Sequence, residues 1–398
     1  MKILFVAPKI PWPATDGSRI ALYELIRHLT ARGHQAGFLG FGDQGAADEF
    51  RTRAGLVWAK AIQHNTATNY LGAALAVLSP MPYTASKYRS GAMTAAIREA
   101  FHEQRFDLVH LEGTHMAHYL GLAQGLGVQA VLRLQNVEWI LEERYARTAI
   151  FPLNHYVRIQ SRRMRAFEMR ACQQADLCVA ITQEDAERIL KLVPDASVAV
   201  SPAGVDLERY SPQPMSEEPG TIVFVGALDW PPNADAVRWF RTKAWPRVTQ
   251  EEPTARWIVV GKSPPADILH WPEEDRNIRV TGFVDDVRPY LHRASVVIVP
   301  LRSGGGMRLK ILEAMAAGKT VVSTPVGAEG ISARSGEEIL LAAADRSFGV
   351  EVIRLLRQAT ERKRIGKAAR AFAEGYGWSG IAADLEEQYQ ALLGSRPR

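Results

Sequence analysis

The sequence has few cysteines and no long apolar run. Two cysteines among 398 residues cannot form a disulfide framework, which indicates a reducing compartment. Cys172 and Cys178 have no matching pair elsewhere, so a cysteine-bound zinc site is excluded. No apolar stretch approaches about 18 residues, the length that a membrane-spanning helix needs. The net charge of +5 permits weak attraction to anions, but the basic residues are not interleaved with aromatic residues, so nucleic acid is not an expected partner.

Length and composition predict a globular protein of two domains. A chain of 398 residues exceeds one ordinary domain of roughly 150 residues. Hydrophobic residues make up 47% and charged residues 23%, which is close to the globular average and excludes extensive disorder. The apolar run Ile3–Ala7 is short and is followed by Pro8, so it is typical of a first strand and not of a signal peptide. We therefore expect a cytoplasmic protein.

Short apolar runs alternate with helical patterns along the chain. Most of the runs are continuous, as expected for parallel strands covered on both faces. The predicted strands are Ile3–Ala7, Ala36–Phe41, Leu108–Leu111, Ala130–Leu134, Leu177–Ile181, Ser197–Val200, Thr221–Gly226, Trp257–Gly261, Ile278–Thr281, Val296–Pro300 and Thr320–Ser323. A segment rich in proline, glycine and serine, residues 201–220, separates two series of strands. This pattern predicts two doubly wound, Rossmann-like α/β domains facing each other across a cleft that holds the ligand.

The most informative segment joins a predicted strand to a predicted helix through three glycines at 304–306. Glycine lets the backbone approach a ligand closely, and a helix start offers free N–H groups to an anion. Arg308 and Lys310 place two cations in the first turn, which costs up to roughly 1 kcal/mol unless an anion offsets them. We therefore predict a diphosphate site here, with Glu313 positioned to accept hydrogen bonds from a ribose. The alternative is a tight turn with a Lys310–Glu313 surface pair.

This segment resembles the nucleotide-sugar signature of retaining glycosyltransferase family four, which has the GT-B fold. It is most similar to a subgroup with a G-G-G-x-R-x-K-I-L-E-A-M-A segment. Further resemblances follow in the family's order along nearly the whole chain: Asp16-Gly17, Gly204-Val205-Asp206, Phe224-Val225-Gly226, Thr281 to Asp286, and Trp378 to Tyr389. They imply an acceptor domain at residues 1–203, a donor domain at residues 204–377, and a helix at about 378–395 that crosses back to the first domain.

The resemblance also implies the site and the activity. The residues expected to bind the nucleotide sugar are Gly17, Gly226, Val284, Gly304, Gly305, Gly306, Met307 and Glu313. The residues expected to serve catalysis are Arg308, Lys310, Gln135 and His110. The implied reaction is a metal-independent, retaining transfer of a sugar from a nucleoside-diphosphate sugar to a hydroxyl of a glycan or lipid-linked acceptor, with no cofactor. The implied setting is synthesis of a cell-surface polysaccharide or glycolipid.

Three positions depart from the family pattern. Gly305 occupies the place of the first glutamate of the E-x7-E pair, so the identity of the sugar does not carry over. The stretch after Gly226 contains no cation, and Arg308 and Lys310 are expected to supply that charge instead. In that stretch Asn233 is interpreted as the N-cap of a following helix. Gln135 stands where the family has a histidine near the reacting sugar, and it could bind a sugar hydroxyl or be a structural amide at a strand end.

Other polar residues of the first domain have two interpretations each. His110, Glu112 and His115 lie at and after a predicted strand end, where they could contact the acceptor or pack as hydrogen-bonded groups under a loop. Glu138 and Trp139 could line an acceptor pocket, although a buried tryptophan usually belongs to the core.

An arginine-rich helical pattern occupies residues 158–170. It could be a surface for anionic lipid, which would place the enzyme peripherally on the inner face of the membrane, or simply a solvated helix face.

Three other functions compete with the transferase. A dehydrogenase would need G-x-G-x-x-G after the first strand, and the stretch Pro8–Pro13 does not fit. A nucleotide-sugar 2-epimerase shares the architecture and would convert the donor without an acceptor. A nucleotide-sugar-binding protein without transferase activity would be consistent with the missing glutamate and histidine, and slow hydrolysis of the donor would argue against it.

Overall fold

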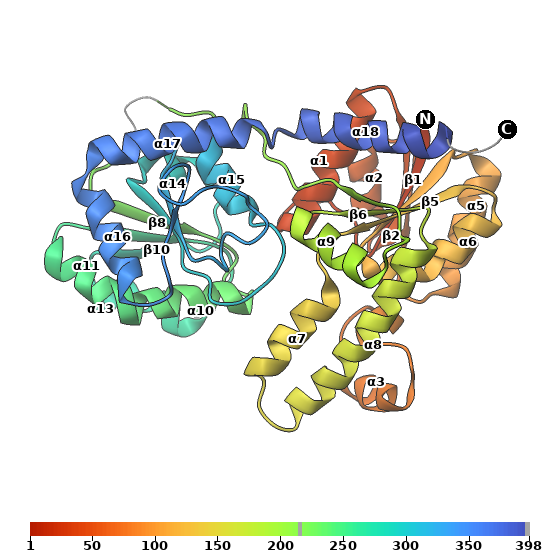
Figure 1. Ribbon diagram of the computed structural model, residues 1–398, viewed down its shortest axis with the longest axis horizontal. Helices are drawn as coiled ribbons and strands as arrows, with labels where there is room; N and C mark the ends of the chain where they lie inside the picture. Colours follow the sequence, from red (N-terminus) through yellow and green to blue (C-terminus); the bar gives the residue numbers. More distant parts are fainter. Residues whose placement is uncertain (214–216, 395–398) are drawn as a thin grey trace. The chain divides into compact units, whose positions relative to one another are not determined.

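The computed structural model describes residues 1–213 and 217–394, which form two compact units (Figure 1). The first unit contains Met1–Ala203 and the chain from Trp378 onward, and the second contains Gly204–Gly377. Each unit is built on its own parallel sheet, which confirms the prediction of two Rossmann-like doubly wound domains. Residues 214–216 of the predicted linker and the predicted helix end at 395 lie outside the described residues.

The first sheet has seven strands in the order β3-β2-β1-β4-β5-β6-β7, all parallel. The strands are β1 Lys2–Ala7, β2 Gln35–Phe41, β3 Trp58–Ile62, β4 Leu108–Glu112, β5 Gln129–Leu134, β6 Leu177–Ala180 and β7 Val198–Val200. Six were predicted within a residue or two at each end. The edge strand β3 was not, because its four leading residues are only half-buried and include Lys60, so it lacks a continuous apolar run.

The second sheet has six strands in the order β10-β9-β8-β11-β12-β13, again parallel. The strands are β8 Thr221–Val225, β9 Arg256–Val260, β10 Ile278–Val280, β11 Val296–Val299, β12 Val321–Ser323 and β13 Leu340–Leu341. The two-residue β13 is too short to produce a pattern in the sequence, and it was missed.

Helices connect the strands in both units. In the first unit they are α1 Gly17–Ala31, α2 Gln44–Ala54, α3 Tyr70–Leu75, η1 Ala76–Leu78, α4 Tyr83–Ser86, α5 Gly91–Glu103, η2 Thr114–Tyr119, α6 Leu120–Gly125, α7 Glu138–Thr148, α8 Leu153–Gln174, α9 Gln183–Leu192 and α18 Trp378–Gly394. In the second they are α10 Pro231–Trp239, η3 Phe240–Ala244, α11 Trp245–Glu251, α12 Ala266–Leu269, α13 Trp271–Glu274, α14 Arg288–Arg293, α15 Leu309–Ala316, α16 Arg346–Arg357 and α17 Ala359–Glu374. Within residues 1–213 and 217–394, no helix has the length and apolar character needed to cross a bilayer.

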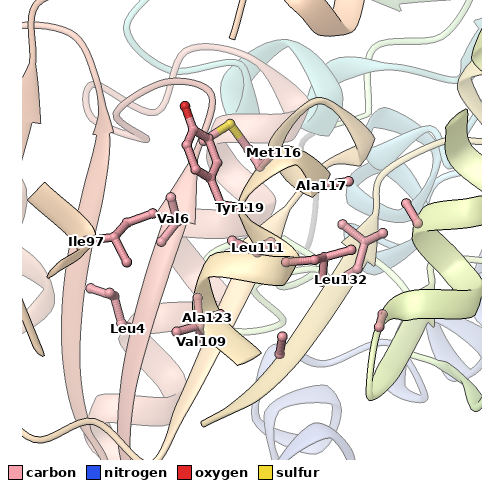
Figure 2. Close-up of a cluster of buried hydrophobic side chains, with 14 of the residues drawn as sticks. Leu4, Val6, Ile97, Val109, Leu111, Met116, Ala117, Tyr119, Ala123 and Leu132 are labelled. Carbon is pink, nitrogen blue, oxygen red and sulfur yellow. The ribbon is translucent and has the colours of Figure 1, made fainter. Parts of the chain in front are cut away.

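Both faces of each sheet are covered by apolar packing. In the first unit, Leu4, Val109 and Leu132 from adjacent strands pack against Ile97 and Met116 of the helices on one face (Figure 2). In the second unit, consecutive residues of β8 alternate: Ile222 and Phe224 join one core cluster, while Val223 joins the other. This double coverage explains why the strand sequences are continuously apolar.

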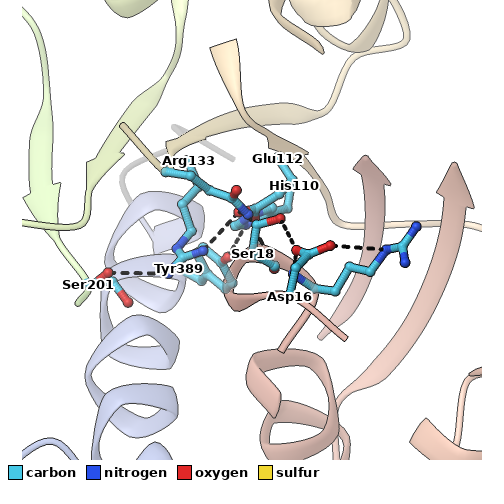
Figure 3. A network of polar contacts seen from close by, with 9 residues as sticks. Asp16, Ser18, His110, Glu112, Arg133, Ser201 and Tyr389 are labelled. Carbon is cyan, nitrogen blue, oxygen red and sulfur yellow. Dashed lines mark hydrogen bonds and ion pairs between the residues drawn. The ribbon is translucent and has the colours of Figure 1, made fainter. Parts of the chain in front are cut away.

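The last helix, α18, belongs to the first unit and packs against α1. At its surface Glu386 pairs with Arg32 at 2.5 Å and with His34 at 3.2 Å. Deeper inside, the hydroxyl of the fully buried Tyr389 is hydrogen-bonded to Nδ1 of His110, also fully buried, on β4 (Figure 3). Helix α18 is therefore held to the first unit by a buried polar contact as well as by apolar packing.

We expect Tyr389→Phe to lower the free energy of unfolding by about 1–3 kcal/mol, because it leaves Nδ1 of His110 buried without a partner while changing the packed volume very little. Urea unfolding followed by circular dichroism measures the loss. Tyr23→Phe is the matched control, since Tyr23 is only partly buried, and it should change the stability by less than about 0.5 kcal/mol. Equal stability of Tyr389→Phe and the parent protein would contradict the anchoring role of this hydrogen bond.

Candidate active site

The predicted diphosphate segment forms a strand–loop–helix unit in the second domain. The buried strand β11 ends at Val299, and the helix α15 begins at Leu309. Between them, Gly304 and Gly306 have φ values of +123° and +72°, which favour glycine over residues with a side chain. Arg308 takes the N-cap position in an extended conformation, so only Lys310 lies in the first turn of the helix. The prediction of two cations in that turn is therefore corrected to one cation before the helix and one within it.

Arg308 folds back over the glycine loop. Its Nη1 donates to the backbone oxygens of Gly305 and Gly306, the second at 2.8 Å, and the guanidinium lies 5.6 Å from the ring centre of Trp230. A Cβ atom on Gly304 would lie 2.6 Å from Nη2 of this arginine. Arg308 and the glycines therefore depend on each other for the shape of the loop.

Lys310 reaches a second group of predicted residues. Its ammonium nitrogen donates to Oδ1 of Asn233 at 2.8 Å and lies 4.5 Å from the ring centre of Phe224. A Cβ atom on Gly226 would come within 2.4 Å of the same nitrogen, so a side chain there would displace the lysine from this position. Burial, and secondarily the positive charge of Arg308, lower the pKa of Lys310 to about 7. The amine is thus balanced between its neutral and charged forms near neutral pH.

Asn233 is a site residue that the sequence reading missed. It was interpreted as the N-cap of a helix, but α10 begins at Pro231 with Trp230 at the cap, which makes that interpretation wrong. The side chain of Asn233 is buried and donates to the backbone oxygen of Ala227 at 2.8 Å while accepting from Lys310. Its amide orients the lysine without neutralising it.

Glu313 is paired differently from both sequence interpretations. Its Oε1 accepts a hydrogen bond from the hydroxyl of Tyr210 at 3.0 Å, and no ion pair joins it to Lys310 among the described residues. Burial raises the pKa of Glu313, despite the opposing effect of the tyrosine hydrogen bond. Val284 and Met307 lie half-buried against the apolar cluster on the same face of the sheet. The structure therefore brings Gly226, Lys310 and the glycine loop together, while ribose binding by Glu313 stays a prediction.

In the first unit, Gly17 begins helix α1 directly after the cap residue Asp16. Asp16 accepts hydrogen bonds from the Arg19 N–H at 3.1 Å, from the Ser18 hydroxyl at 2.8 Å and from Lys9 at 3.0 Å. Burial raises the pKa of Asp16, but the charge and hydrogen bond of Lys9 outweigh it, so the net shift is downward. Gly17, which is predicted to bind the donor, therefore directly follows a charged helix cap.

His110 belongs to a buried polar network and not to an exposed site (Figure 3). Its Nε2 contacts Oε2 of Glu112 at 2.9 Å, and Oε1 of that carboxylate accepts from Arg133 and from Gln135, each at 2.8 Å. Burial lowers the pKa of His110, which favours the neutral ring. With both ring nitrogens occupied and no exposed surface, His110 cannot contact an acceptor, and its assignment as a catalytic residue is corrected to a structural one.

Gln135 lies at the edge of the same network and is half-buried. Its Nε2 contacts the Glu112 carboxylate at 2.8 Å and the Ser18 backbone oxygen at 3.5 Å, which ties the end of β5 to the start of α1. Its amide oxygen is a hydrogen-bond acceptor that suits a sugar hydroxyl. The substrate role of Gln135 stays a prediction.

Three carboxylates near the start of α7, one buried and two half-buried, were not predicted as a group. Burial raises the pKa of Glu138 and of Glu142 to about 7, and that of Glu168 to about 8. Glu168 accepts from the Thr114 hydroxyl and from the Glu138 N–H, at 2.5 and 3.2 Å. His115 is half-buried, and desolvation lowers its pKa to about 4. The described residues contain no group of three or more side chains placed to hold a metal ion.

Comparison with known protein families matches both domains. Residues 15–209 match the family described as Glycosyltransferase Family 4, and residues 219–358 match the family described as Glycosyl transferases group 1. Among curated relatives, a phosphatidyl-myo-inositol mannosyltransferase of Mycobacterium tuberculosis is 28% identical over 209 residues, covering 49% of this chain and 54% of that protein. A D-inositol 3-phosphate glycosyltransferase of Kribbella flavida is 28% identical over 239 residues, covering 53% and 55%. The chain thus spans about half the length of these relatives.

Solved structures share the whole fold. The sucrose-phosphate synthase of Thermosynechococcus elongatus superimposes with a TM-score of 0.75 at 16% identity, covering 100% of both chains. Anabaena HepE in complex with UDP gives a TM-score of 0.69 at 15% identity, covering 98% of this chain and 100% of that one. At such identity the likeness shows the fold alone. With both domains matched by models of transferase families, the chain belongs to the group 1 and family four glycosyltransferases and has the GT-B fold.

Proposed function

We propose that this glycosyltransferase moves a sugar from a nucleoside-diphosphate sugar to a hydroxyl of a glycan or glycolipid, with retention of configuration and without a metal ion. The observation that carries the proposal is the amine of the half-buried Lys310, which lies beside Gly226 and Asn233 at the start of α15. Its hydrogen-bond partner among the described residues is a neutral amide. A partly desolvated cation without a carboxylate partner is costly, and an anionic ligand would remove that cost.

A diphosphate fits this position better than other anions. The glycine loop offers backbone at close range, the helix N-terminus offers a positive field, and Arg308 lies before the first turn. Two cations and a helix start could balance the charge that develops on a diphosphate leaving group, which is the main electrostatic demand of glycosyl transfer. In this proposal the chain itself supplies the charge that a divalent metal would otherwise provide. The subgroup with the G-G-G-x-R-x-K segment is the one we propose for this chain.

We propose retention because the resemblance to family four implies it. His110 is enclosed and both of its ring nitrogens have partners, so it is not placed to deprotonate an acceptor. We propose that an oxygen of the leaving diphosphate takes the acceptor proton on the same face of the sugar, so that positioning and charge stabilisation are the tasks of the protein.

The relatives inform the acceptor and the location. One relative is named for mannosyl transfer to phosphatidyl-myo-inositol, another lies in the cps region of Klebsiella pneumoniae, and HepE was solved with UDP. From these names we propose a uridine or related nucleotide donor, a lipid-linked or glycan acceptor, a role in cell-surface polysaccharide synthesis, and a cytoplasmic location with peripheral contact to the inner membrane face.

Replacing Arg308 and Lys310 together by Ala should weaken donor binding by about a hundredfold or more, because two charge-assisted contacts to the diphosphate would be lost. A thermal-shift screen across UDP-, GDP-, ADP- and dTDP-sugars identifies the donor and measures the change, since a ligand at about 100 times its Kd stabilises by about 2.7 kcal/mol. Lys243→Ala with Arg247→Ala, both on exposed positions of the same unit, is the matched control. Unchanged donor affinity in a variant that melts normally without ligand would refute the diphosphate site.

Donor affinity should also depend on pH through Lys310. In the free protein this amine loses its proton above about pH 7, and bound diphosphate would raise its pKa, so binding takes up a proton above that pH. The dissociation constant should therefore rise by up to about tenfold per pH unit above neutrality, and stay nearly constant in Lys310→Arg, whose guanidinium remains charged. Isothermal titration with an intact nucleotide sugar tests this. The same pH slope in both proteins would exclude Lys310 as the titrating group.

A further inference from the structure

Helices α7 and α8 form an antiparallel hairpin that projects from the sheet of the first unit (Figure 1). Large apolar side chains are exposed in its connecting turn and at the adjoining ends of the two helices. Ile150 is 82% exposed, Phe151 75%, Tyr145 54% and Leu153 42%. We call these four residues the hairpin tip. Single exposed apolar residues are common on protein surfaces, but four at the end of one projection indicate a surface that binds an apolar partner.

The hairpin behind this tip is basic. Between residues 138 and 174 the sequence has seven arginines and four glutamates, whereas the first 200 residues as a whole have 22 basic and 18 acidic residues. The hairpin therefore carries a net charge of +3, against +4 for the first 200 residues as a whole. Of the four glutamates, Glu168 is fully buried and Glu138 and Glu142 are half-buried. Burial raises the pKa of these three carboxyl groups to about 7 or 8, which reduces the negative charge that they carry near neutral pH.

Three arginines share one face of α8. Arg158, Arg162 and Arg165 follow the spacing i, i+4, i+7 and are all exposed. Arg163 points elsewhere: it donates to the backbone oxygens of Ala76 at 2.7 Å and of Val77 at 2.6 Å. That contact ties the turn η1, with its 87% exposed Leu78, to the same hairpin. Apolar groups at the end and a basic row behind them match the two layers of an anionic lipid surface, acyl chains below and phosphate groups above.

We propose that the hairpin tip inserts into an anionic membrane, with Arg158, Arg162 and Arg165 contacting the lipid phosphates. The proposal deepens the membrane contact put forward under the proposed function and rests on it. It moves the contact from the arginine-rich face of α8 alone to the apolar turn between α7 and α8. A lipid-linked acceptor would then be met at the surface where it resides. A protein partner or a second copy of this chain would bind the apolar tip without requiring anionic lipid.

Co-sedimentation with vesicles tests the proposal without donor or acceptor. We expect the parent protein to bind vesicles that contain phosphatidylglycerol more tightly than vesicles of phosphatidylcholine alone, with binding weakened by salt. The double variant Ile150→Ser with Phe151→Ser should lower the partition coefficient by about tenfold or more on anionic vesicles. Arg158→Gln with Arg162→Gln should remove the preference for anionic vesicles. Leu269→Ser, an exposed apolar position of the second unit, should leave both unchanged.

Each outcome decides the matter. A parent protein that stays in the supernatant, or a tip variant that binds vesicles as the parent does, would overturn the proposal. Sedimentation velocity tests self-association as the alternative. If the parent protein is a dimer that does not bind vesicles, and the tip variant is a monomer, the tip is a self-association surface. The thermal shift with nucleotide sugar is recorded on every variant. Lost vesicle binding with a retained shift rejects the membrane contact alone, and a missing shift with retained vesicle binding rejects the donor assignment alone.

Discussion

The first unit depends on one buried charge, the carboxylate of Glu112. A charge removed from water must be compensated by hydrogen bonds and opposite charge, and Glu112 receives Arg133, Gln135 and His110. Burial raises its pKa, but the charge of Arg133 and the hydrogen bond of His110 outweigh that effect and keep the pKa below its ordinary value. Through His110 the network continues to Tyr389, so two strands of the sheet and the returning helix are bound to a single group. Removing any member would leave its neighbours buried and unpaired.

In the second unit the charge of Lys310 is compensated only in part. Lys310 is enclosed by Phe224, Gly226 and Asn233 and receives an amide oxygen instead of a carboxylate. Removing a charge from water costs free energy in both units, and the two units compensate that cost to different extents. Where the chain compensates the charge completely, the group holds the fold together, and where it compensates the charge only in part, the remaining demand is available to a ligand. This contrast separates the structural His110 from the site residue Lys310.

Much of the architecture was predictable because burial on both faces forces a strand to be apolar throughout. Strands such as β1 and β11 satisfy that condition and were predicted with nearly correct ends, whereas the half-buried edge strand β3 does not and was missed. The glycine loop was predictable for a similar local reason, since positive φ values require glycine. Within the site, Gly226 and Lys310 were named from the sequence, but Asn233 was misread as a cap because helix starts and buried amides use the same residue type.

The sequence by itself determined two βα series, the break between them, and a glycine-rich helix start with cations beside it. These follow from interactions between residues close together in the chain, which periodicity and turn chemistry record. Only the tertiary structure decided which polar side chains meet. Tyr389 contacts His110 across 279 positions, and Lys310 contacts Asn233 across 77, because the order of strands in a sheet differs from their order in the sequence. The exposure of the turn between α7 and α8 is likewise visible only in the folded structure, because the sequence alone would predict these apolar residues to be buried in a core.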